Sequence, residues 1–254
     1  MTFTDDELTR DGFLGGQLQL FQPRHGYRAA TDPVFLAAFA PVRPGERVLD
    51  LGCGVGTAGL CLARRVEGVE LHGLEIQPPY AELARRNAAE NGIAMCVHEG
   101  DLAKLPSELR QVSFHHVLMN PPFYRADDAT GPGDPGRDTA HREGQVDLAG
   151  WIATGLRRLL PKGWLTIVHR VERLDDILAA LSPQAGGIEI LPLAPREGRP
   201  ANRVLVRARK ASAAPLRLHF PLVIHQGKRH EQDGNDFTGV VQDLLLGRMS
   251  VLID

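Results

Sequence analysis

The chain has 254 residues, of which 43% are hydrophobic and 24% are charged, a composition typical of a globular protein with a full apolar core. Its formal net charge is −2, which does not favour strong non-specific binding to nucleic acid, so any RNA or DNA site must depend on a local patch. The three cysteines, Cys53, Cys61 and Cys96, form no CxxC pair and are odd in number, so reduced thiols in a cytoplasmic protein are expected rather than disulfides.

The sequence predicts no signal peptide, membrane-spanning segment or metal site. The first ten residues, MTFTDDELTR, are acidic and lack the apolar segment of a signal peptide. The longest apolar stretch, PVFLAAFAPV, is too short to span a bilayer. The closest histidine pairs are His115 with His116 and His225 with His230, and neither has acidic or cysteine partners at ligand spacing.

Residues 1–45 precede the regular part of the pattern. The stretch GQLQLFQPRHGYR alternates apolar and polar side chains around a Pro-Arg-His-Gly break, which predicts a hairpin. The following TDPVFLAAFAP predicts a helix, with Asp32 as its cap and Pro33 in its first position.

From Pro44 onward, predicted strands alternate with predicted helices. The helices are TAGLCLARRV, PPYAELARRNAAEN and DLAGWIATGLRRLL, the last with an apolar stripe of Leu148, Trp151, Ile152, Leu156, Leu159 and Leu160. The seven strands are RVLDLGCG, VELHGLE, AMCVHEGD, FHHVLMN, GWLTIVH, IEILPL and ANRVLVRARK. This alternation predicts an α/β fold with a mostly parallel seven-stranded sheet and helices on both faces.

Glycine or polar residues follow the first four predicted strands. Because ligands bind at the carboxyl ends of the strands in open parallel sheets, these residues are the candidates for a site. They are, strand by strand, Asp50 with Gly52, Gly54 and Gly56; Glu75; Asp101; and Asn120 with Pro121, Pro122 and Phe123.

The chemistry of these residues favours one ligand over a dinucleotide. The glycine loop reads GxGxG rather than GxGxxG, and Asp50 beside it suits a cationic group better than a phosphate. Glu75 can accept hydrogen bonds from both hydroxyls of a ribose, and Asp101 from an exocyclic amine. The set predicts S-adenosylmethionine; an NAD-type enzyme or a glycine turn packed on a helix is the alternative.

The ordered set resembles the class I S-adenosylmethionine-dependent methyltransferases, and the NPPF tetrapeptide resembles the motif of those that methylate planar nitrogens. The resemblance implies a Rossmann-like fold without a metal or covalent nucleophile. It also implies that the Asn120 side-chain oxygen and the Pro121 carbonyl accept hydrogen bonds from a substrate –NH₂, while Phe123 stacks on the target base. Asn120 is expected to belong to the cofactor-binding residues as well as to the catalytic ones. The plainer alternative is that Asn120 caps a turn after the strand.

Nearly the whole chain is similar to the bacterial tRNA(Val) adenine-N6 methyltransferase family, through GYRAATDPVFLAAFAP, NPPF, AHRE, DLAGWI and NRVLVRARK. This similarity implies that Tyr27, Arg28, Thr31 and Asp32 fold over the cofactor site. It implies a loop near RNA, with candidate phosphate contacts at Arg125, Arg137, His141 and Arg142, each of which is otherwise a solvated surface residue.

Basic residues also gather near the last predicted strand, at Arg196, Arg199, Arg203, Arg207, Arg209 and Lys210. On alternating strand positions several of them share a face and would meet phosphate groups. The alternative is an edge strand protected by its charges.

The expected activity is methylation of adenine N6 in the anticodon loop of a tRNA, where the bases are already exposed. Alternatives are guanine-N2 methylation of rRNA, glutamine methylation of a release factor, and a non-catalytic module that binds the cofactor or RNA. One domain is expected over 1–254. Residues 1–45 would form a hairpin and helix over the cofactor site, 46–210 the Rossmann-like core and 211–254 a C-terminal extension.

Overall fold

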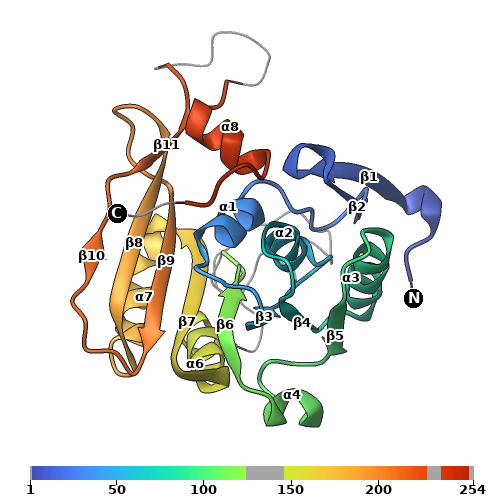
Figure 1. Ribbon diagram of the computed structural model, residues 1–254, viewed down its shortest axis with the longest axis horizontal. Coiled ribbons are helices and arrows are strands. Elements are labelled where there is room, and N and C mark those ends of the chain that lie inside the picture. Colours follow the sequence, from blue (N-terminus) through green and yellow to red (C-terminus); the bar gives the residue numbers. More distant parts are fainter. Residues whose placement is uncertain (1, 124–145, 228–235, 252–254) are drawn as a thin grey trace.

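The computed structural model describes residues 2–123, 146–227 and 236–251. In these residues the main sheet has nine strands, ordered β10-β8-β9-β7-β6-β3-β4-β5 with β11 beside β8 (Figure 1). The strands are β3 (Arg47–Leu51), β4 (Glu70–Glu75), β5 (Met95–Glu99), β6 (Phe114–Met119), β7 (Leu159–Arg170), β8 (Ala185–Arg196), β9 (Arg203–Lys210), β10 (Arg217–Leu218) and β11 (Leu222–His225).

The sheet is mostly parallel, as predicted. Strands β3 to β7 pair in parallel, whereas β9 is antiparallel to both β7 and β8. The seven predicted strands correspond to β3–β9, and the short strands β10 and β11 enlarge the sheet beyond the prediction by pairing with β8.

Helices cover both faces of the sheet (Figure 1). One face packs against α1 (Asp32–Phe39), α2 (Thr57–Arg65) and α3 (Pro78–Glu90), with α8 (Gly239–Leu245) beside α1. The other packs against α4 (Ser107–Gln111), α6 (Leu148–Arg158) and α7 (Leu174–Leu181). Alternate strand residues serve the two cores, since Val48 and Leu118 belong to the first and Leu49 and Val117 to the second. No helix within the described ranges is long and apolar enough to cross a membrane.

The N-terminal hairpin forms with a different turn from the one predicted. Strands β1 (Leu8–Phe13) and β2 (Leu18–Pro23) are joined by the 3-10 turn η2 (Leu14–Gly16), where Gly15 and Gly16 have φ of 66° and 90°. Two glycines accept these left-handed angles readily, so the reversal occurs there. The Pro-Arg-His-Gly break instead leads the chain out of the hairpin toward α1. Two further short 3-10 turns are η1 (Asp5–Glu7) and η3 (Val171–Arg173).

Two helix boundaries also differ from the predictions. The predicted stripe placed Leu159 and Leu160 on a helix, but α6 ends at Arg158 and both residues belong to β7. Pro161 disfavours helical backbone at the residue before it, which explains the early end. The N-cap of α1 is Thr31 rather than Asp32, and Asp32 instead pairs with Arg203, Oδ2 to Nε at 3.2 Å.

The edge-strand interpretation of the basic segment is wrong, because β9 lies between β7 and β8. Its cationic groups already have partners within the fold. Arg207 pairs with Glu189 at 2.8 Å and Arg209 donates to the Lys162 carbonyl at 2.9 Å. Lys210 donates to the Leu159 carbonyl, and Arg196 pairs with Asp236. Of the six basic residues, Arg199 in the turn before β9 and Arg209 on β9 are exposed; the phosphate contacts stay a prediction.

Candidate functional site

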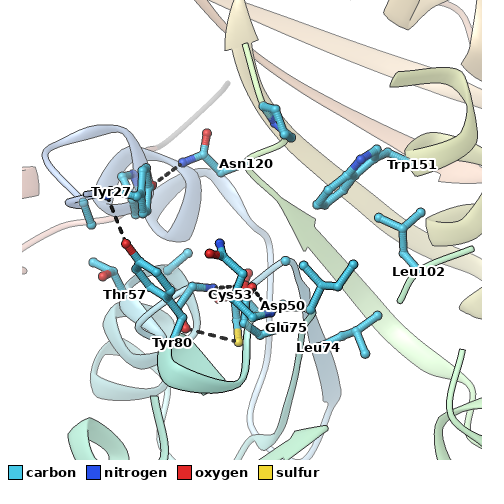
Figure 2. A pocket seen from close by; sticks show the side chains of 18 of the residues that line it. Tyr27, Asp50, Cys53, Thr57, Leu74, Glu75, Tyr80, Leu102, Asn120 and Trp151 are labelled. Carbon is cyan, nitrogen blue, oxygen red and sulfur yellow. Dashed lines mark hydrogen bonds between the residues drawn. The ribbon is translucent and has the colours of Figure 1, made fainter. Parts of the chain in front are cut away.

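A cavity of about 380 Å³ opens at the carboxyl ends of β3, β4 and β6 (Figure 2). Its lining joins segments that lie far apart in the sequence, from the turn before α1 to the first turns of α6. Eight predicted site residues line it: Tyr27, Asp50, Gly52, Gly54, Glu75, Asp101, Asn120 and Pro122.

The glycine loop after β3 is held against β4 by its backbone. The N–H groups of Gly52 and Cys53 both donate to the Leu74 carbonyl, at 2.8 and 2.9 Å. Gly52 has φ of +74°, and a Cβ atom there would lie 2.4 Å from the ring of Trp151. The loop therefore needs glycine at this position both for its backbone angle and for the indole that packs on it.

Gly52→Ala is expected to lower the free energy of unfolding by about 2–3 kcal/mol, because the methyl group adds a clash with Trp151 to the cost of a left-handed backbone. Gly68→Ala is the matched control, since Gly68 has φ of +75° and open space around it. It should cost only about 1 kcal/mol. Urea unfolding measures both values, and equal losses would show that Trp151 moves aside freely.

The Glu75 carboxylate, 6% exposed, links the loop to the end of β4. Its Oε2 accepts from the Gly54 N–H at 2.9 Å and its Oε1 from the Gln77 N–H at 2.8 Å. Burial raises the pKa of Glu75, while these backbone bonds oppose the rise. Each oxygen keeps acceptor capacity toward the cavity, because a carboxylate has about four lone-pair sites.

Asp50 lies beneath the same loop and is buried. Burial raises its pKa to about 7, an effect opposed by the Gly59 N–H and reinforced by Glu75. The Gly59 N–H donates to Asp50 Oδ2 at 2.9 Å, near the start of α2. Two buried carboxyl groups therefore face one cavity, and a cationic ligand group there would offset the cost of ionising them.

Asn120 follows β6 and has one end of its amide held. Its Nδ2 donates to the Tyr27 hydroxyl at 3.3 Å, and the Tyr27 N–H donates to the Tyr80 hydroxyl at 3.0 Å (Figure 2). The other end, Oδ1, is buried and has no hydrogen-bond partner among the described residues. Thr57 also lines the cavity, and its Oγ1 is likewise buried and has no hydrogen-bond partner among the described residues. Such oxygens are costly unless a ligand satisfies them.

The turn after Asn120 is held from behind by His169 of β7. The His169 Nε2 donates to the Pro122 carbonyl at 3.2 Å, and the Arg170 N–H donates to Nδ1 at 2.9 Å. Burial lowers the pKa of His169 to about 4, so it stays neutral in the tautomer that these bonds require. Its ring also meets Phe123 edge to face, and the Arg203 guanidinium lies 4.7 Å from the Phe123 centroid.

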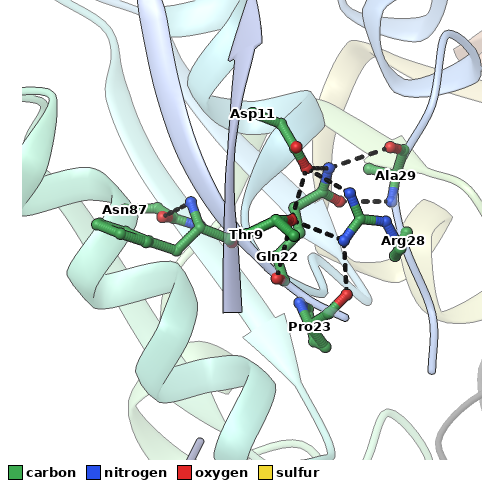
Figure 3. Close-up of polar contacts among 8 residues, drawn as sticks. Thr9, Asp11, Gln22, Pro23, Arg28, Ala29 and Asn87 are labelled. Carbon is green, nitrogen blue, oxygen red and sulfur yellow. Dashed lines mark hydrogen bonds and ion pairs between the residues drawn. The ribbon is translucent and has the colours of Figure 1, made fainter. Parts of the chain in front are cut away.

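Five other predicted site residues are described by the structure but do not line the cavity: Arg28, Thr31, Gly56, Pro121 and Phe123. Arg28 instead clamps its own segment to the hairpin (Figure 3). It donates to Thr9 Oγ1, the Pro23 carbonyl and Asp11 Oδ2, each at 2.7 Å. This clamp and the bonds between Gln22 and Ala29 fix the chain on both sides of Tyr27. The candidate phosphate contacts Arg125, Arg137, His141 and Arg142 lie outside the described residues.

Sequence reasoning missed several residues that complete the cavity: Cys53, Ile76, Tyr80, Leu102 and Trp151. Trp151 was assigned to an apolar helix face, because helical spacing does not distinguish a core residue from one at the rim of a pocket. Ile76 carries a usable signal in the sequence, since it directly follows Glu75; in the structure it is 56% exposed despite being apolar.

Residues 31–132 match the family model described as methyltransferase small domain. The chain is 30% identical over 209 residues to a Porphyromonas gingivalis protein named tRNA1(Val) (adenine(37)-N6)-methyltransferase, covering 78% of this chain and 81% of the relative. An Aeromonas hydrophila protein of the same name is 30% identical over 201 residues, covering 77% and 82%.

A solved structure from Agrobacterium tumefaciens, described as a predicted O-methyltransferase, is also similar. It has a TM-score of 0.69 and 31% identity, and the match covers 86% of this chain and 97% of that one. The shared architecture therefore extends beyond the segment that matches the family model.

Proposed function

The chain belongs to the family of the tRNA1(Val) (adenine(37)-N6)-methyltransferases, and from this premise we propose that it methylates the N6 amine of adenine 37 in the anticodon loop of a tRNA(Val). The family prediction is confirmed by these relatives, and so is the Rossmann-like fold. The protein is a methyltransferase that uses S-adenosylmethionine.

The buried Oδ1 of Asn120, which has no partner in the part of the chain that the structure describes, carries the proposal about the reaction. A turn that only terminates a strand would satisfy its own carboxamide, because a buried acceptor without a partner costs about 1–3 kcal/mol. The bond from Nδ2 to Tyr27 fixes which end of the amide is left over, and the remaining end is an acceptor. A substrate –NH₂ is the donor that suits it.

The residues around the cavity suit S-adenosylmethionine. Glu75 offers two carboxylate oxygens for a ribose, and Asp101 offers an acceptor for an exocyclic amine. Ile76 and Leu102, which line the cavity beside these acceptors, provide apolar walls for a flat base. The glycine loop lets its backbone approach the cofactor closely. The buried carboxyl group of Asp50 suits the positive charge that the cofactor carries. A volume of about 380 Å³ is in the range of small-molecule pockets.

S-adenosylmethionine supplies the methyl group when bound. The chain's own residues orient the acceptor. Asn120 Oδ1 and the Pro121 carbonyl hold the two hydrogens of the amine, which directs its lone pair away from conjugation with the ring. These oxygens also stabilise positive charge as it develops on the nitrogen. Their fixed positions are expected to make the largest contribution to the rate of methyl transfer.

We propose that Phe123 stacks on the target adenine. The Arg203 guanidinium near its ring and the edge-to-face contact with His169 support this role, because they fix the orientation of the phenyl group. His169 acts as a positioning residue by holding the Pro122 carbonyl, so that the turn keeps its shape when the substrate is absent.

The domain organisation follows from the same proposal. Residues 1–45 would cover the cofactor, 46–210 form the core, and 211–254 extend it as part of one domain. Tyr27 in the cavity lining supports the cover, and so do the two hydrogen bonds, 2.7 and 3.0 Å, by which Asn87 of α3 holds the Phe21 backbone of the hairpin strand β2. Arg28 and Thr31 would then support Tyr27 from outside the cavity, and a cytoplasmic location would accompany a tRNA substrate.

Labelled S-adenosylmethionine tests the proposal when the purified protein is incubated separately with a tRNA(Val) transcript, ribosomal RNA and a release factor. Label should enter the transcript and appear as N6-methyladenosine after digestion. A transcript with guanine in place of adenine 37 should stay unlabelled. Label found only in ribosomal RNA or in protein would contradict the proposed substrate.

A further inference from the structure

Three potential metal ligands converge on one face of β4 and β5: His72, Cys96 and His98. The Nε2 atom of His98 lies 3.1 Å from Nδ1 of His72 and 3.4 Å from Sγ of Cys96. One ligand atom from each residue lies within 4.8 Å of the others. The strand register explains the convergence, because His72 pairs with Cys96, and His98 follows two residues later on the same face.

These separations fit a small four-coordinate ion. Zinc binds imidazole nitrogen at about 2.0–2.1 Å and thiolate sulfur at about 2.3 Å, so neighbouring ligand atoms of a tetrahedral site lie roughly 3.3–3.6 Å apart. The observed 3.1 and 3.4 Å are within a few tenths of an ångström of those edges. Small rotations of the two imidazoles would direct their lone pairs at one point.

A carboxylate orients the first of these ligands. The Oε1 of Glu70 lies 3.1 Å from Nε2 of His72, so the opposite ring nitrogen, Nδ1, faces the other two ligands. This arrangement of carboxylate, imidazole and metal position is the usual outer-shell pattern of zinc-binding histidines. Phe114 packs edge to face against the His72 ring, with centroids 5.2 Å apart, and limits its motion.

Access to the group is open on one side. His72 is buried, His98 is half-buried and Cys96 is exposed. Two imidazoles with one thiol are a borderline-soft ligand set that suits zinc-type ions and leaves a fourth position for water. We propose that His72, Cys96 and His98 bind one divalent ion of the zinc type across β4 and β5.

Such an ion would stabilise the edge of the sheet next to the cofactor cavity. Strand β5 is the outermost strand on its side and has little buried surface. His72 precedes Glu75 by three residues and His98 precedes Asp101 by three, so the ion would tie together the two strands that carry these carboxylates. The sequence spacing gave no sign of the group, because its ligands come from two separate strands.

Cobalt titration of chelator-treated, reduced protein tests the site. We expect one equivalent of Co²⁺ to bind with a near-ultraviolet thiolate band and with visible bands typical of four-coordination, and Zn²⁺ to displace it. When the free Zn²⁺ concentration is about a hundred-fold above the Kd for Zn²⁺, the Tm should be roughly 5–10 °C higher than that of the metal-free protein. Cys96→Ser should abolish the thiolate band, and His98→Gln should weaken binding at least ten-fold.

His25→Gln is the matched control, since His25 is exposed and belongs to a loop outside the group; it should bind Co²⁺ like the unmodified protein. Circular dichroism shows whether Cys96→Ser folds, and the exposed position of Cys96 favours that outcome. Absence of stoichiometric binding, or a thiolate band that persists in Cys96→Ser, would overturn the proposal and leave a hydrogen-bonded histidine pair beside a free thiol.

Discussion

Asn120→Ala is expected to lower kcat by about 10²- to 10³-fold while the Kd for S-adenosylmethionine changes little. Removing one preorganised hydrogen-bond partner of a reacting group costs roughly 2–4 kcal/mol of transition-state stabilisation. The variant loses Oδ1, which has no partner among the described residues, whereas the glycine loop, Glu75 and Asp50 that line the cavity keep their own bonds. Single-turnover kinetics with saturating tRNA measure the chemical step, and calorimetry measures the cofactor affinity.

Two further variants separate the role of Asn120 from a general disturbance. Tyr27→Phe removes the acceptor of the Asn120 Nδ2 bond but keeps Oδ1, so its kcat should fall less, by about ten-fold. Asn202→Ala removes an exposed carboxamide next to β9 and should leave kcat unchanged. If Asn120→Ala turned over at the normal rate, the carboxamide would have no part in orienting the amine.

Glu75→Ala is expected to weaken S-adenosylmethionine binding by roughly 30- to 300-fold, because hydrogen bonds to a charged acceptor contribute about 1.5–3 kcal/mol each. The loss has two sources in this structure. The carboxylate would accept from the ribose, and it also holds the N–H groups of Gly54 and Gln77, both of which line the cavity. Glu75→Gln keeps one oxygen and should give an intermediate Kd.

Glu99→Gln is the matched control for this variant. Glu99 pairs with Glu75 in the register of β4 and β5 but is exposed and forms an ion pair with Arg85 at 2.8 Å. Its substitution should leave the Kd within about two-fold, since surface ion pairs contribute little. Calorimetry on folded variants, checked by urea unfolding, gives the comparison. An unchanged Kd in Glu75→Ala would remove this residue from the cofactor site.

Local patterns in the sequence were enough to predict seven strands of the sheet and the helices α1, α2, α3 and α6, but not the short strands β10 and β11 or the helices α4 and α7. Runs of apolar residues that alternate with amphipathic segments leave few arrangements other than a covered parallel sheet. The grouping of polar residues at the strand ends was predicted by the same reasoning, because parallel strands present their carboxyl ends at one edge of the sheet. Asp50, Glu75, Asp101 and Asn120 therefore lie around one cavity in the structure, as their order along the chain predicted.

Local patterns did not reveal the contacts between residues that are distant in the sequence. Arg203 and Arg207 look like a basic face in the sequence, but Asp32 and Glu189, from other elements, pair with them. The resemblance to the family implied that Arg28 folds over the cofactor site, and the structure adds that its guanidinium binds the hairpin through Asp11. A partly buried cationic side chain forms an ion pair with a carboxylate that the fold brings near it. A single sequence does not show which carboxylate that is.

By itself, then, the sequence determined the type of sheet, the order of the polar strand ends and the NPPF tetrapeptide after the fourth predicted strand, because each depends on residues that are close together in the chain. The tertiary structure alone decided which end of the Asn120 amide the Tyr27 hydroxyl holds, that Trp151 covers Gly52, and that His72 meets Cys96 and His98. These three features depend on strand register and helix packing, which bring distant side chains to within a few ångströms of one another.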